Sequence, residues 1–161
     1  MRKLYAYKKG DACPVEDFLK NINKKLHTKL LFQLAYMLDE SNGFLEPYVK
    51  HFSLAKYRQM YEIRVKAAET MMRIIFYEKD GEIIFLHAFY KHDRRDTGKA
   101  LETAYRILES ITDRNGNVSE ECKKEVHLLD YEFGDTVKFY CNPNDKTTPD
   151  FEFEIFKPGS N

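Results

Sequence analysis

Apolar residues in the first quarter of the chain occur at helical spacing, after one short alternating stretch. Polar and apolar side chains alternate over residues 3–8, which predicts a short strand. After the turn Gly10-Asp11, either Asp11 or Cys13 precedes Pro14, a favourable first residue of a helix. A short amphipathic helix is predicted over 14–22. Its apolar face is formed by Val15, Phe18, Leu19 and Ile22.

A second helix is predicted to follow and to pair with the first as a helical hairpin. It ends at Ser41-Asn42-Gly43, a sequence typical of a helix C-terminus. One face of this helix is apolar and is formed by Leu26, Leu30, Leu34, Met37 and Leu38.

The apolar spacing then changes from helical to alternating, which predicts three strands over 60–66, 70–78 and 82–91. The segment Lys79-Asp80-Gly81-Glu82 is a hairpin turn with the Asp-Gly signature. The strand over 82–91 is apolar on both faces, so we expect it at the centre of the sheet. A last helix is predicted at about 96–112 and ends before the segment 113–117. Its buried face is expected to contain Leu101, Ala104, Leu108 and Ile111.

The order of these elements predicts an α+β domain over residues 1–112. We expect a twisted antiparallel sheet packed by the N-terminal helical hairpin and the later helix. Residues 113–161 form a C-terminal extension. In this extension we expect a short helix over 119–130 capped by Ser119, strands at 136–141 and 151–156 and a turn at 142–145. The segment 151–156 has one apolar and one acidic face and could extend a sheet edge.

Composition places the chain among globular proteins, with 43% hydrophobic and 32% charged residues. No apolar run approaches the ~20 residues of a membrane-spanning helix. The N-terminus has no apolar signal region, so the expected location is the cytoplasm, away from any membrane. The three cysteines, which form no CxxC pair, are expected to be reduced and structural. They are Cys13, Cys122 and Cys141.

A net charge of zero hides an asymmetry between the two parts of the chain. Residues 1–112 hold 20 Lys and Arg against 15 Asp and Glu, whereas residues 113–161 hold 6 against 11. A basic body suggests an anionic partner, although chance gives such an imbalance too. The acidic extension could pack beside the basic surface and restrain it. The plainer interpretation is that it extends the sheet or binds a partner.

Cationic side chains on the predicted strands are the main candidates for chemistry. Arg64 lies on the polar side of its strand, with Glu62 and Lys66, and Arg73 interrupts an apolar strand. Desolvating an unpaired guanidinium is costly, so Arg73 must pair with a carboxylate or face a groove. The central strand and its end supply further candidates. His87, Phe89 and Lys91 share one face, and His92, Asp93, Arg94 and Arg95 follow.

Ordinary structural roles for the same residues remain open. Arg64 could be a solvated strand residue paired to Glu62 or Glu78, and His87 could be a core histidine. Lys91 and His92 could simply be solvated at a strand end. The chain has no nucleotide-binding glycine loop, no zinc-protease motif and no serine-hydrolase motif, and its five histidines show no metal-ligand spacing. We therefore expect neither a metal nor a cofactor.

Clustered cations suit the cleavage of an RNA phosphodiester. The 2′-hydroxyl must lose a proton, negative charge builds on the phosphate oxygens, and the leaving 5′-oxygen needs a proton. Arginines donate bidentate hydrogen bonds to phosphate. A lysine or histidine whose pKa is depressed by neighbouring cations can move protons.

From about residue 3 to residue 110 the chain resembles the RelE/ParE toxin superfamily, in particular its phage-derived HigB-like branch. The resemblance rests on short motifs that follow in family order and spacing. These are PVEDFLKNI, LEPYVKHF, MYEIRV, MRIIFY, IIFLHAFYKH and ALETAYRI. It implies a toxin of a type II toxin–antitoxin pair, often a ribosome-dependent endoribonuclease that cleaves messenger RNA and is neutralised by a helix-turn-helix antitoxin.

By position, the resemblance assigns phosphate and transition-state contacts to Arg64 and Arg73 and a basic catalytic role to Lys91. His87 matches a histidine of the family's central-strand segment. From the cationic cluster itself we add His92 to the catalytic candidates and Lys66, Arg94 and Arg95 as RNA-binding candidates. The chain departs from the family at Ala88, where glycine is common, at His92, where a second lysine is common, and at Thr97-Gly98, where proline is common. The alternatives are a non-catalytic toxin that binds a protein such as gyrase, and an inactive member kept as a binding module.

Overall fold

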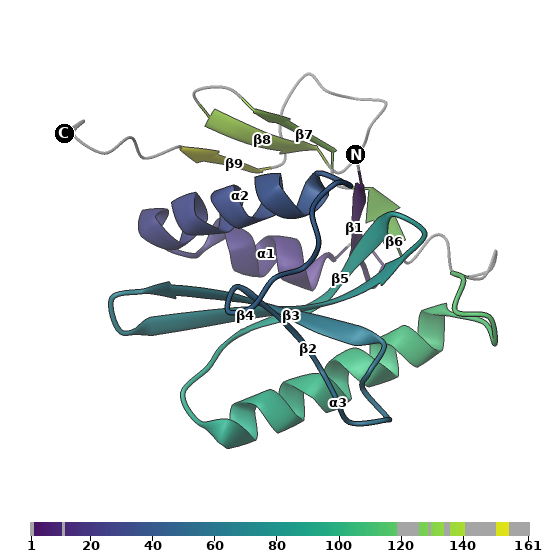
Figure 1. Ribbon diagram of the computed structural model, residues 1–161. Coiled ribbons are helices and arrows are strands. Elements are labelled where there is room, and N and C mark those ends of the chain that lie inside the picture. The colour runs from purple at the N-terminus through teal and green to yellow at the C-terminus, as the bar shows by residue number, and fades with distance from the viewer. Residues whose placement is uncertain are drawn as a thin grey trace.

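A computed structural model describes residues 2–10 and 12–118 of the protein in full, and residues 126–128, 130–133, 136–140 and 151–154 by their backbone. The chain forms three helices and nine strands within these residues (Figure 1). In chain order they are β1 (Lys3–Tyr7), α1 (Pro14–Lys20), α2 (Lys24–Leu38), β2 (Val49–His51), β3 (Met60–Ala67), β4 (Thr70–Lys79), β5 (Glu82–Tyr90), α3 (Arg94–Ile111), β6 (Val126–Leu128), β7 (Asp130–Phe133), β8 (Thr136–Tyr140) and β9 (Phe151–Glu154).

The main sheet is mixed, which corrects the expected all-antiparallel sheet. Its strand order is β2-β3-β4-β5-β1-β6. The strands β2 to β5 form an antiparallel meander, but β1 runs parallel to β5, with Leu4 opposite Ile83 and Ala6 opposite Phe85. After β1 the chain passes through the helical hairpin of α1 and α2 and enters the sheet again at the edge strand β2. The meander then runs back from β2 to β5, which places β5 next to β1. The predicted interior place of β5 is confirmed.

A tight turn and a bulge define the hairpin of β4 and β5. Asp80 and Gly81 both have positive φ, 53° and 81°, as the predicted two-residue Asp-Gly turn requires. The pairing register then shifts between Ile75 and Phe76, so that Phe76 lies opposite Phe85 whereas Ile75 lies opposite His87. This bulge leaves Leu86 as an extra residue and changes which side chains of β5 point to each face.

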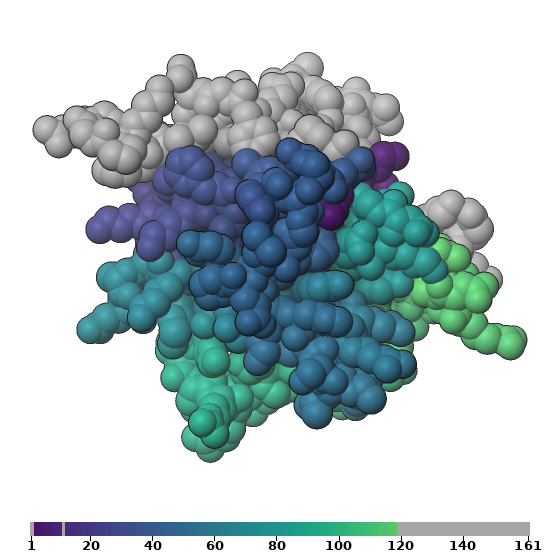
Figure 2. All heavy atoms as spheres, viewed as in Figure 1, coloured from purple at the N-terminus to yellow at the C-terminus, as the bar shows by residue number. Residues whose placement is uncertain are grey.

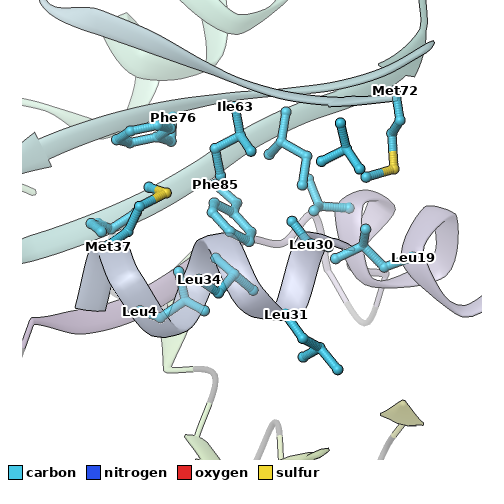
Figure 3. Packing of buried hydrophobic residues seen from close by; sticks show 14 of the residues in the cluster. Leu4, Leu19, Leu30, Leu31, Leu34, Met37, Ile63, Met72, Phe76 and Phe85 are labelled. Atoms are coloured by element: carbon cyan, nitrogen blue, oxygen red, sulfur yellow. The ribbon is translucent and has the colours of Figure 1, made fainter. Parts of the chain in front are cut away.

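Helices cover the sheet on both faces, and each side has its own core. The hairpin of α1 and α2 lies on one face and α3 on the other (Figure 1). Figure 3 shows Leu30 and Leu34 of α2 directed toward Phe85 of the sheet. The core under α3 includes Ile75, Ile84, Leu86, Ala104 and Leu108. Figure 2 shows the surface on the side of α2 and the segment that follows it.

Most predicted elements within residues 1–112 are confirmed within a few residues. The short strand β2 was not predicted; three residues give too little alternation to be recognised. The helix expected over 119–130 is wrong for 126–128, which form β6 beside β1, and residues 119–125 lie outside the described residues.

The expected strands at 136–141 and 151–156 are represented by β8 and β9, which form a second, three-stranded sheet with β7. Residues 151–154 do extend a sheet edge, that of the second sheet, since β9 pairs with β8, whereas the strand of the extension that joins the main sheet is β6, beside β1. The turn at 142–145 lies outside the described residues, and the boundary at residue 112 stays a prediction. No helix in the part of the chain that is described is both long and apolar enough to cross a bilayer.

Candidate functional site

Pairing between β3, β4 and β5 arranges the candidate residues in neighbouring rows across the sheet. In one row Arg64 lies opposite Arg73, which lies opposite Phe89. The next row holds Glu62, Ile75 and His87. Directly opposed residues point to the same face, and Ile75 belongs to the core under α3. The two arginines and His87 therefore share the α3 face of the sheet.

His87 is on this face because of the bulge in β5. Strict alternation from Leu86, which packs under α3, would direct His87 to the opposite face. The extra residue instead places His87, together with Phe89, on the α3 face, and their rings stack with centroids 5.9 Å apart. The predicted sharing of a face by these two residues is confirmed. Burial lowers the pKa of His87, so the imidazole is neutral near pH 7.

Glu62 joins the two arginines and is the principal residue that the site adds to the sequence-based candidates. Its side chain is 1% exposed, and Oε1 lies 3.2 Å from Arg64 Nε and 3.5 Å from Arg73 Nε. Sequence reasoning offered Glu62 only as an ordinary partner of Arg64. The signal was its position two residues before Arg64, which puts both side chains on one face of the strand. The shared carboxylate reduces the net charge of the cluster to +1.

Arg73 is buried rather than open to solvent, with 8% of its surface exposed. Its Nη1 donates to the carbonyl oxygen of Met72 at 3.2 Å, and its Nη2 lies 3.8 Å from the sulfur of Met71. Burial lowers the pKa of Arg73, while Glu62 raises it and Arg64 lowers it again. The prediction that Arg73 must pair with a carboxylate or face a groove is confirmed, since it also lines the groove described below.

Arg64 is the accessible member of the pair, with its side chain 31% exposed. Glu62 receives its Nε–H, and no hydrogen bond to its terminal Nη atoms occurs among the described residues. A guanidinium held at Nε with free Nη groups presents two donors to an external anion.

Lys66 and Lys91 extend the cationic surface by one more row. Lys66 lies opposite Met71, and the backbone N–H of Lys91 donates to the carbonyl oxygen of Met71 at 2.9 Å. The chain at Lys91 therefore still runs beside β4, next to the row of the two arginines. Lys66 is exposed and Lys91 half-buried.

The first turn of α3 presents the remaining predicted residues. Asp93 caps the helix by accepting from the backbone of Arg95 and Asp96, while Asp96 accepts from the backbone of His92 and Asp93. His92, Arg94 and Arg95 are exposed, and Arg95 pairs with Asp93 at 3.5 Å. Within the described residues, no hydrogen bond or ion pair connects this turn to Arg64 or Arg73.

A groove of about 880 Å³ runs around the edge of β3 and opens beside the arginines. Arg64, Lys66 and Arg73 line it on the sheet side. The other side is formed by α2 and by the segment between α2 and β2, through Lys29, Phe32, Gln33, Tyr36, Met37, Leu45, Glu46, Pro47, Tyr48 and Val49. Apart from the three cations of β3 and β4, none of these residues was a sequence-based candidate, because helical spacing assigns Phe32 and Tyr36 no chemistry.

Among the residues described, no cluster of three or more His, Cys, Asp or Glu side chains could hold a metal ion. The site of the described chain thus consists of guanidinium, ammonium, imidazole and aromatic groups around one buried carboxylate. Such a set can bind an anion and transfer protons.

Comparison with known proteins gives one match. The family model described as "Phage derived protein Gp49-like (DUF891)" matches residues 17–109, which include α2, β2 to β5 and nearly all of α3. No curated protein matches the chain, and no solved structure does.

Proposed function

Since this chain belongs to the Gp49-like family of phage-derived proteins, which is a RelE/ParE-like toxin family, we propose that it is the toxin of a type II toxin–antitoxin pair. We place it in the HigB-like branch and propose that it cleaves messenger RNA on the ribosome without a metal. Its partner would be a helix-turn-helix antitoxin encoded by a short neighbouring reading frame. The observation that supports this best is that Arg64 lies opposite Arg73, and that both line a groove together with Lys66.

The proposed chemistry assigns each group a task that its surroundings permit. Arg64 donates its free Nη groups to the scissile phosphate, while Arg73, buried behind it, keeps the local potential positive. His87 is neutral near pH 7 and can take the proton of the 2′-hydroxyl. Lys91, with His92 after it, supplies a proton to the leaving 5′-oxygen, and Arg94 and Arg95 contact flanking phosphates.

The test is induced expression in bacteria of the wild type, Arg64→Ala and Arg64→Lys, with growth and messenger RNA ends measured together. We substitute Arg64 rather than Arg73 because Arg64 is partly exposed, so its replacement should lower the free energy of unfolding only slightly. We expect growth arrest with new RNA ends in the wild type, and loss of both with Arg64→Ala. Lysine should restore activity only in part, because it cannot form the bidentate contact. Glu102→Gln, at the partly exposed ion pairs of α3 with Lys56 and Arg106, serves as the control.

A second candidate is a non-catalytic toxin that binds a protein target such as gyrase. Two observations favour it: Arg73 is buried, and Glu62 cancels part of the positive charge. This alternative predicts growth arrest without new RNA ends. An inactive binding module predicts no arrest at all.

A further inference from the structure

Large hydrophobic side chains gather at the groove beside β3. The described residues contain six that are exposed, and four of them line this groove: Phe32 at 63%, Tyr36 at 44%, Leu45 at 55% and Tyr48 at 60%. The remaining two, Leu54 and Tyr90, lie outside it. Exposed apolar side chains are ordinary when scattered, but their concentration in one hollow indicates a ligand surface.

Three of the four gathered side chains are aromatic, and cations stand among them. Phe32 and Tyr36 are four residues apart on α2, so they form one stripe of the helix with Lys29. Lys29, Arg64 and Lys66 line the groove against one carboxylate, that of Glu46. Aromatic faces next to fixed positive charges are the combination with which proteins hold single-stranded nucleic acid.

The backbone at this edge of the sheet is already bonded, which argues against a peptide strand as the ligand. Arg64 N–H donates to Tyr48 O at 2.7 Å, and its carbonyl oxygen accepts from Gln33 Nε2 at 2.8 Å. The carbonyl oxygen of Lys66 accepts from Lys29 Nζ. The other amide atom of Gln33, Oε1, is buried without a partner among the described residues.

We propose that this groove binds unpaired RNA nucleotides, with bases stacked on the rings of Tyr48 and Phe32 and phosphates at Arg64 and Lys66. This inference rests on the proposed function, because it assumes that Arg64 contacts an RNA phosphate. A strand whose phosphate lies at Arg64 continues directly into the groove, since Arg64 and Lys66 line both the groove and the candidate site. The groove thus gives the enzyme a preference for unpaired substrate.

The experiment measures binding of the full chain to a ten-nucleotide 2′-O-methyl RNA, which cannot be cleaved. The RNA carries fluorescein at one end and one 2-aminopurine base. Because the chain contains no tryptophan, the emission of 2-aminopurine reports stacking without interference. Tyr48→Ala and Phe32→Ala should each weaken binding about tenfold and restore the emission of the stacked base. Tyr48→Phe should bind like the wild type.

Matched variants separate this inference from the proposed function. Leu54→Ala removes an equally exposed apolar side chain outside the groove and should bind RNA like the wild type. Arg64→Ala should weaken binding and reduce its salt dependence, whereas Tyr48→Ala should leave the salt dependence unchanged. If Arg64→Ala weakens binding but the aromatic variants match Leu54→Ala, the groove does not hold RNA and the inference is overturned alone.

Two other outcomes would also contradict the binding of RNA bases in the groove. Binding by Tyr48→Leu as tight as that of Tyr48→Phe would overturn base stacking, because an apolar side chain without a π-face would then suffice. Unchanged RNA binding by Arg64→Ala would remove the proposed function together with this inference.

Discussion

Among single residues, Glu62 carries the largest expected energetic effect, because it is a buried carboxylate shared by two guanidinium groups. Removing one partner of a buried ion pair leaves the other charge without compensation, which costs roughly 3–5 kcal/mol. We expect Glu62→Ala to lower the free energy of unfolding by about that amount, since Arg73 is then buried without a carboxylate. Glu62→Gln keeps an acceptor oxygen and should lower it less. Urea unfolding measures both.

The matched control is Glu102→Gln, which weakens the partly exposed pairs of Glu102 with Lys56 and Arg106 but keeps an acceptor oxygen for the Tyr57 hydroxyl. An exposed pair contributes about 0–1 kcal/mol, so this variant should unfold nearly like the wild type. If Glu62→Ala were as mild as this control, the carboxylate would not hold Arg73 in the folded protein.

His87 should make stability depend on pH. Burial lowers its pKa in the folded state, so below the ordinary value of about 6.5 the unfolded chain binds the proton first. Stability is therefore fully present above pH 6.5 and is lost as the pH falls toward the folded pKa. Urea unfolding at pH 7.5 and 5.5 should show a loss of at most about 1.4 kcal/mol from this residue.

His87→Gln should reduce this acid-induced loss. His27, whose pKa burial also lowers, contributes a second loss in the same direction, so the double variant should reduce it further. If the wild type and His87→Gln lost equal stability between pH 7.5 and 5.5, other titrating groups would cause the pH dependence.

At the scale of elements, the start of α3 determines where the cations after β5 are presented. Asp93 and Asp96 form a capping box there. Asp93→Ala removes acceptors for two backbone N–H groups and should cost about 1 kcal/mol. The first turn, with Arg94 and Arg95, should then fray and exchange its amide hydrogens faster. Asp93→Asn retains a capping oxygen and should stay close to the wild type. Unchanged exchange in Asp93→Ala would show that packing of Ala100 and Leu101 alone fixes this turn.

Local patterns predicted those features of the fold that depend on neighbouring residues. Alternation over residues 60–66 correctly put Glu62 and Arg64 on one face, and Asp80-Gly81 predicted the turn between β4 and β5. The parallel pairing of β1 with β5 was missed, because it depends on where distant strands finally meet. The bulge that directs His87 toward α3 was missed as well, since the extra residue appears only when two strands are aligned.

The candidate site was predictable as a set of residue types but not as a geometry. A buried arginine in an apolar strand required a partner, and Arg73 has one. That Glu62 would serve both arginines depends on the register of β3 with β4, which the sequence of either strand does not specify. The groove combines α2, the following segment and β3, and no local pattern links these three.

For the molecule as a whole, the C-terminal extension has a structural role that truncation can separate from a regulatory one. β6 pairs with β1 in antiparallel register, with Tyr5 opposite Leu128 and Tyr7 opposite Val126. A chain ending at Val118 loses this strand and exposes the edge of β1, whereas a chain ending at Leu128 keeps it. We expect the melting temperature of the shorter chain to fall by about 4 °C more than that of the longer one, as for a loss of roughly 1 kcal/mol, because both chains lack β9 and its contacts with α2.

The same two truncations test whether the acidic extension restrains the basic surface. Residues 113–161 hold 11 Asp and Glu against 6 Lys and Arg, so their attraction to the body would weaken RNA binding and depend on salt. We expect instead that the chain ending at Leu128 binds 2′-O-methyl RNA as the full chain does, because β6 gives the start of the extension a place in the sheet. Tighter binding after truncation, most pronounced at low salt, would establish the restraint and assign the extension a role like that of an antitoxin segment.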